Sequence, residues 1–120
     1  MMKLFHLLWE LLFPPKCILC GNLLEKEETD LCRTCRVETA EYPVGKRKLQ
    51  FLDSFTAVWY YEGSIRRSLL RYKFYGRRGY ARVYGQLVAM EILREHPDGF
   101  DILTYIPISR LRRLRRGYDQ

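Results

Sequence analysis

Leucines recur at helical spacing near the start of the chain. Within residues 3–13 the apolar positions fall three and four residues apart, which predicts one amphipathic helix. Pro14-Pro15 end this helix, because proline lacks a backbone donor and clashes with the preceding turn. We assign residues 1–13 to the helix and expect its leucines to pack on the protein's own core. Its polar face carries little positive charge and the run is too short for a membrane span, which disfavours a membrane role.

The second half of the chain alternates between strand and helix patterns. Residues 55–61 are β-branched and aromatic, which predicts a strand that ends at Gly63. Ser64 is the expected N-cap of a first amphipathic helix, and Tyr80 begins a second helix that ends at the turn residues 96–99. Residues 102–108 are typical of a buried strand. This order predicts an α/β fold class for the second half, and α+β for the chain as a whole. The apolar positions of the two helices are Ile65, Leu69, Leu70 and Phe74, and Tyr80, Val83, Tyr84, Leu87, Val88 and Ile92.

The four cysteines form two Cys-x-x-Cys pairs, Cys17 with Cys20 and Cys32 with Cys35. Each pair places two sulfurs on one face of a tight turn, and two such turns complete a tetrahedral cage for Zn²⁺. Gly21 suits the sharp backbone turn that follows the second sulfur. Four protein ligands leave no coordination position for water, so the predicted zinc is structural. We therefore expect a zinc-ribbon module over residues 14–42, held together by the metal.

Two disulfides in an oxidising compartment are the alternative use of these cysteines. The N-terminus looks superficially like a signal peptide, but His6 and Glu10 interrupt its apolar run. No small-residue cleavage site follows it, because the next residues are Pro14-Pro15 and Lys16. These observations favour zinc, and with it a reducing compartment, the cytoplasm.

Charge is divided unevenly along the chain, whose net charge is +7. Residues 1–60 hold eight basic and eight acidic side chains, whereas residues 61–120 hold thirteen basic and six acidic ones. The imbalance favours a polyanionic or phosphorylated partner near the second half, although surplus arginine also occurs on ordinary solvated surfaces.

Arginines gather directly after the predicted final strand, where ligands bind in open α/β sheets. Guanidinium groups match the geometry of phosphate oxygens. A second basic block, between residues 66 and 82, is interleaved with aromatic residues, a pattern that suits single-stranded nucleic acid. Core packing is the alternative use of these aromatic side chains. The candidate phosphate- or nucleic-acid-binding residues are Arg110, Arg112, Arg113, Arg115, Arg116, Lys73, Arg77 and Arg78.

The chain contains, in order, the segments LLFPPKCILCG, LCRTC, YKFYGRRGYARVYGQLVA and DILTYIPISRLRRLRRGYDQ. This series resembles the ComF family of competence-associated proteins. The resemblance implies an N-terminal double zinc ribbon followed by a type I phosphoribosyltransferase-like domain. It also implies a role in DNA uptake alongside a helicase-like partner, and it places residues 107–116 in a loop that contacts pyrophosphate.

Transferases of this fold hold a ribose 5-phosphate through a later strand that ends in two acidic residues and a Thr-Thr-Gly-type loop. The only paired acids of this chain, Glu27-Glu28, lie between the two cysteine pairs. We therefore expect a truncated family member whose transferase-like part, residues 50–120, is incomplete and does not catalyse alone. Three functions stay open. They are binding of single-stranded DNA or phosphate in DNA uptake, phosphoribosyl transfer that needs the missing C-terminal segment, and protein interaction through the metal module and leucine-rich helix.

Overall fold

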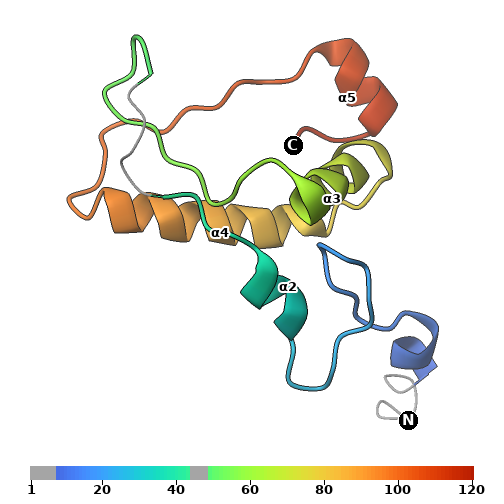
Figure 1. Ribbon diagram of the computed structural model, residues 1–120. Helices are drawn as coiled ribbons and strands as arrows, with labels where there is room; N and C mark the ends of the chain where they lie inside the picture. The colour runs from blue at the N-terminus through green and yellow to red at the C-terminus, as the bar shows by residue number, and fades with distance from the viewer. Residues whose placement is uncertain (1–7, 44–48) are drawn as a thin grey trace. The chain divides into compact units, whose positions relative to one another are not determined.

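The computed structural model describes residues 8–43 and 49–120. The chain divides into two compact units, Met1–Thr39 and Ala40–Gln120. The first contains α2 (Arg33–Glu38), and the second contains α3 (Gly63–Phe74), α4 (Tyr80–Glu95) and α5 (Arg110–Arg116) (Figure 1).

The described part of the first unit opens with a helical segment at residues 8–12. Phe13 still donates its backbone N–H to the Trp9 carbonyl, and the helix then ends before Pro14-Pro15, as predicted. Leu4 and Leu7 of the predicted helix lie outside the described residues.

The expectation that this helix packs on the protein's core is wrong for residues 8–13. Their large apolar side chains are exposed, and Leu11 keeps 77% of its surface open. Among the described residues of this unit, Cys17, Ile18, Leu19 and Cys35 are buried. Because the loops around the sulfurs supply this small interior, the described part of the helix contributes nothing buried to it.

Two of the three named helices of the second unit form where the periodicity predicts them. α3 and α4 share an interior made of Ile65, Ser68, Tyr72 and Val83. The Glu62 carbonyl accepts the first helical hydrogen bond of α3, from Arg66. The residue at the N-cap is therefore Glu62, without a side-chain cap, and the expectation of Ser64 in that role is wrong.

Tyr72 is the aromatic centre of the second unit. Its ring lies 5.7 Å from that of Tyr84 in α4 and 5.6 Å from that of Tyr118, which follows α5. The Tyr72 hydroxyl also donates to the backbone carbonyl of Gln120 at 3.4 Å. These contacts bring the segment after α5 against α3, although 48 residues separate Tyr72 from Gln120.

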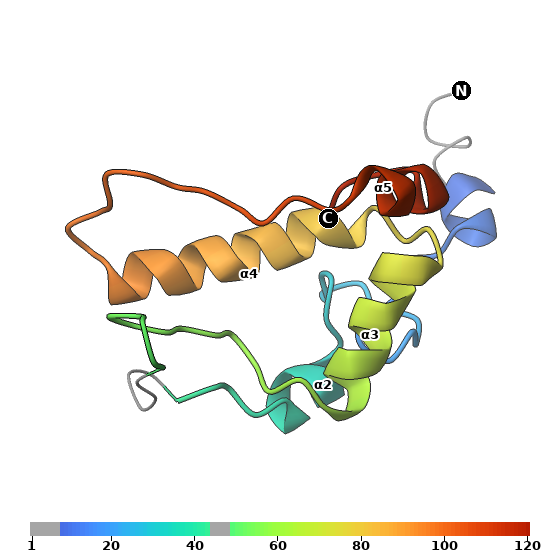
Figure 2. The same ribbon diagram turned by 90° about the horizontal axis from the view of Figure 1, so that it is seen from above.

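The predicted strands at residues 55–61 and 102–108 are wrong for this structure. Residues 55–61 make a single antiparallel bridge, between Trp59 and Glu41, and residues 102–108 form no strand. A strand needs a neighbour for its backbone N–H and C=O groups, and the described residues supply no ladder for either segment. The chain after α4 therefore runs as an extended segment to α5 (Figure 2). The predicted α/β class is thus not met in the described residues, whose regular structure is helical.

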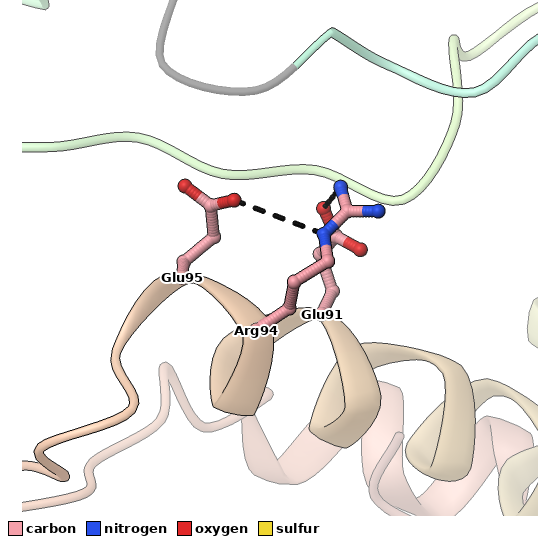
Figure 3. Close-up of polar contacts among 3 residues, drawn as sticks. All are labelled: Glu91, Arg94 and Glu95. Carbon is pink, nitrogen blue, oxygen red and sulfur yellow. Dashed lines mark hydrogen bonds and ion pairs between the residues drawn. The ribbon is translucent and has the colours of Figure 1, made fainter.

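Acidic side chains gather at the C-terminal end of α4. The Arg94 guanidinium lies 2.6 Å from a carboxylate oxygen of Glu91 and 3.9 Å from one of Glu95 (Figure 3). α4 ends at Glu95, in agreement with the predicted stop, and the N–H of its C-cap residue, His96, donates to the Ile92 carbonyl. An exposed ion pair of this kind contributes little to stability, but it compensates the charge of Arg94.

Candidate functional site

The first cysteine pair lies in a tight turn that begins at Cys17. The Gly21 N–H donates to the Cys17 carbonyl at 2.9 Å, and the Cys17 N–H donates to the Asn22 carbonyl at 2.8 Å. Gly21 has φ +82°, a conformation that is strained for residues with a Cβ. The turn leaves the Asn22 N–H directed at the Cys20 sulfur, 3.4 Å away. Backbone geometry therefore places both sulfurs of this pair on one side of the turn.

The second cysteine pair lies at the beginning of α2. Cys32 is the N-cap of this helix, and its sulfur accepts from the Cys35 N–H at 3.5 Å. Cys35 is buried in the first full turn, whereas Cys32 is partly exposed. A helical turn thus positions this pair, in contrast to the loop that positions the first pair.

The two pairs converge into one cluster of four sulfurs. All four Sγ atoms lie within 4.8 Å of one another, and those of Cys20 and Cys32 are 3.7 Å apart. A tetrahedral zinc with Zn–S bonds of about 2.3 Å requires sulfurs about 3.8 Å apart. A disulfide would require about 2.05 Å. All four thiols are free, so the structure favours the metal over the disulfide alternative.

The protonation of these thiols is strongly perturbed. Burial raises the pKa of Cys17, but backbone hydrogen bonds from Cys20, Cys32 and Leu19 outweigh it and lower that pKa to about 7. Burial and contacts with the other three sulfurs raise the pKa of Cys35, and burial also raises the pKa of Cys20. Four crowded thiols cannot all ionise unless a cation balances their charge, and Zn²⁺ supplies that charge when bound. The donor set therefore fits a structural Zn²⁺ held by Cys17, Cys20, Cys32 and Cys35.

Glu28 supports the loop between the two pairs, a role that the sequence reasoning did not identify. Its carboxylate accepts from the backbone N–H of Glu25 at 2.9 Å and from that of Arg33 at 2.6 Å. These two hydrogen bonds, together with the nearby Arg33 and Arg36 charges, hold the pKa of Glu28 below its usual value. Because Arg33 is the first residue of α2, Glu28 fixes the loop to the helix that carries Cys32 and Cys35. An acidic residue a few positions before a helix start is the signal that could have indicated this role.

Four of the eight candidate cationic residues converge in the second unit. They line a cavity of about 440 Å³ between the end of α3 and α5, which we call the α3–α5 hollow. Its lining consists of Lys73, Phe74, Gly76, Arg112, Arg115 and Arg116. No acidic side chain of residues 8–43 or 49–120 lines the hollow, so the charge of this lining is uniformly positive.

The other four candidates lie elsewhere. Arg110 and Arg113 line a separate cavity with Leu114 and Gly117. The Arg78 guanidinium stacks 5.3 Å from the centre of the Tyr118 ring. The backbone carbonyl of Arg77 accepts a hydrogen bond from the Tyr80 N–H in the turn before α4, and Arg77 lines neither of these cavities. The two sequence blocks thus meet through Lys73 and part of α5.

Acidic and basic residues are segregated along the second unit. Residues 63–90 and 102–118 contain no Asp or Glu, and all eight candidate residues fall within these two stretches. Glu91 and Glu95 instead surround Arg94 at the far end of α4 (Figure 3). Asp119, three positions after Arg116, is the acidic residue nearest in sequence to the arginines of the α3–α5 hollow, and it is not part of the lining.

A comparison with known protein families supports the assignment of a zinc ribbon to the N-terminal part of the chain. Residues 8–47, which are one third of the chain, match the family model of the double zinc ribbon domain. All four cysteines lie inside the match. The chain therefore contains a double zinc ribbon domain with a structural zinc-binding site. No curated protein and no solved structure matches the chain. Within residues 8–43 and 49–120, no helix combines the length and apolar character needed to cross a bilayer.

Proposed function

We propose that the chain is a ComF-like nucleic-acid-binding protein that acts in DNA uptake, with a zinc-stabilised module joined to a phosphate-binding unit. The observation that supports it most is the α3–α5 hollow, where Lys73, Arg112, Arg115 and Arg116 meet in a lining whose described residues include no Asp or Glu. A cavity with one sign of charge concentrates anions and strengthens their binding. Free thiols suit a reducing compartment, so the proposal includes a cytoplasmic location. The resemblance to the ComF family adds a helicase-like partner to the proposal.

Arginine suits this role because its planar fork matches two phosphate oxygens at once. α5 presents Arg112, Arg115 and Arg116 within five residues, on a helix whose two leucines are exposed. The helix therefore contributes almost nothing to the interior of the unit. Its sequence is better explained by a charged ligand than by packing.

A salt titration tests the proposal. The affinity of the zinc-loaded full chain for a labelled single-stranded oligonucleotide should fall steeply as salt rises, by about 0.7 in log–log slope per phosphate contact. Changing Arg112 and Arg115 together to Ala should reduce that slope by about 1.4. Arg94→Ala is the matched control, because Glu91 and Glu95 already compensate this arginine. A weak salt response that the double variant leaves unchanged would overturn the proposal.

Phosphoribosyl transfer is the second candidate, because the same charges fit a phosphorylated ribose. The chain offers no free pair of acids for the ribose, since Glu28 of the single Glu-Glu pair is engaged by two backbone N–H groups. We therefore propose no catalysis by this chain alone. Calorimetry with a ribose 5-phosphate ligand separates the two candidates, since nucleic-acid binding alone predicts no preference for the sugar phosphate over inorganic phosphate.

Protein interaction is the third candidate, and the exposed apolar residues 8–13 favour it. It predicts that the labelled oligonucleotide does not bind in the salt titration. Binding of a partner protein through these residues would respond only weakly to salt, because it depends on apolar contacts.

A further inference from the structure

The α3–α5 hollow has an aromatic wall as well as cationic ones. Phe74 is the aromatic residue among its lining residues, and it keeps 60% of its surface exposed. The helical periodicity predicts Phe74 as a core position, but its neighbours Ile65, Ser68 and Tyr72 supply the buried face of α3 instead. Phe74 thus has little packing role in the interior, and the part of its ring that Arg116 does not cover is open to a ligand in the hollow.

The guanidinium of Arg116 makes two contacts, and one of them is with the ring of Phe74. The guanidinium carbon lies 4.8 Å from the ring centre, in a cation–π arrangement. A nitrogen of the same guanidinium also donates to the side-chain carbonyl of Gln120. Two contacts therefore orient Arg116 before any ligand arrives, which lowers the entropy cost of binding.

We propose that the α3–α5 hollow binds a nucleotide unit of a single-stranded nucleic acid, with the base stacked on Phe74 and Arg116. This inference rests on the proposed function and adds to it a base-binding position and a preference for single strands. Lys73, Arg112 and Arg115 lie in the same lining and provide the charges for the adjacent phosphates. Aromatic rings and guanidinium planes both stack on bases, and the cavity volume falls in the range of about 300–1,000 Å³ typical of ligand sites.

Stacking on Phe74 requires an exposed base face. In a duplex each base is stacked and paired, so its face is not available without unpairing. Phosphate contacts alone would instead bind single strands, duplexes and abasic backbones by charge. Base stacking and phosphate binding can therefore be distinguished by comparing single strands with duplexes and abasic backbones.

Fluorescence anisotropy on the zinc-loaded full chain tests it with three labelled probes of equal length. The probes are a single-stranded DNA, a single strand of abasic sites and a duplex. We expect the single-stranded DNA to bind most tightly. Phe74→Ala should lower its affinity by about 5- to 150-fold, the range for loss of one stacked base, and leave the abasic probe unaffected.

Three variants control this measurement. Phe74→Tyr keeps an aromatic face and should restore binding, whereas Phe74→Leu keeps apolar bulk and should not. Phe51→Ala removes a phenylalanine that is 93% exposed and is not part of the hollow, and it should have no effect.

The outcomes distinguish this inference from the proposed function. Equal, salt-dependent affinity for DNA and abasic probes, with no effect of Phe74→Ala, would overturn the stacking position and leave phosphate binding intact. No binding of any probe at low salt would overturn both.

Discussion

The hydroxyl groups of Ser68 in α3 and Tyr84 in α4 lie 2.6 Å apart and share a hydrogen bond. Ser68 is fully buried and Tyr84 is partly buried, so this bond lies in the interior between the two helices. It joins α3 to α4 at a point where a polar group without a partner would be costly.

Ser68→Ala should lower the free energy of unfolding by about 1–3 kcal/mol, because it removes the partner of the Tyr84 hydroxyl. Tyr84→Phe removes the same bond, so the double variant should lose less than the sum of the two single changes. Urea unfolding of the zinc-loaded chain measures all three. Ser64→Ala is the matched control on the same helix and should have little effect, since Ser64 does not cap α3. Strictly additive losses would show that the two hydroxyls are not coupled.

Stability should fall in alkaline solution. Burial raises the pKa of Tyr84 and that of Tyr72, so the folded state binds the phenolic proton more tightly than the unfolded state does. A group whose pKa is raised by folding stabilises the folded state fully at pH values below its unfolded pKa, which is about 10 for tyrosine. This stabilisation is lost as the pH rises through the pKa of the folded state. The thermal midpoint of the helical signal should therefore drop above that pH. Tyr84→Phe should make the drop smaller, and an unchanged drop would assign it to other groups.

Periodicity predicts much of the second unit because helix formation depends on local spacing. α3 and α4 begin and end within about two residues of the turn signals around Gly63, Gly79 and His96. The strand predictions for residues 55–61 and 102–108 fail because strand formation does not depend on local spacing alone. The apolar composition of these residues suits a sheet, but a sheet depends on neighbours at a distance in the sequence. Ile106, for example, is 95% exposed in a segment without a ladder.

The metal site is easier to predict than the cationic site. Cys-x-x-Cys spacing defines the turn and the chemistry together, so all four cysteines could be identified from the chain alone. The α3–α5 hollow joins Lys73 to Arg112, which are 39 positions apart, and no local pattern encodes that proximity. The backbone contacts of Glu28 are equally invisible to periodicity, because they depend on how the loop closes on α2.

Glu28→Ala should weaken zinc retention, because Glu25 and Arg33 each lose a backbone hydrogen bond that ties the loop to α2. Competition with a chromogenic chelator measures this as faster release of the metal. Glu27→Ala is the matched control, since it removes the adjacent exposed carboxylate and leaves these two bonds in place. The pKa of Glu28 is lowered in the folded chain. The contribution of Glu28 to the stability of the folded loop should thus be present above about pH 4.3, the ordinary pKa of glutamate. It should be lost as the pH falls through the lower pKa that Glu28 has in the folded chain. Equal release rates from both variants would contradict this role.

Native mass spectrometry of the full chain tests the zinc centre most directly. The account predicts one zinc per chain, with all four thiols reduced and protected from alkylation until a chelator removes the metal. Cys17→Ser and Cys35→Ser should each abolish stoichiometric zinc and unfold the first unit, whereas Thr34→Ser, between the ligands of the second pair, should retain it. A folded chain without metal, or one whose mass shows the cysteines joined as disulfides, would contradict the account.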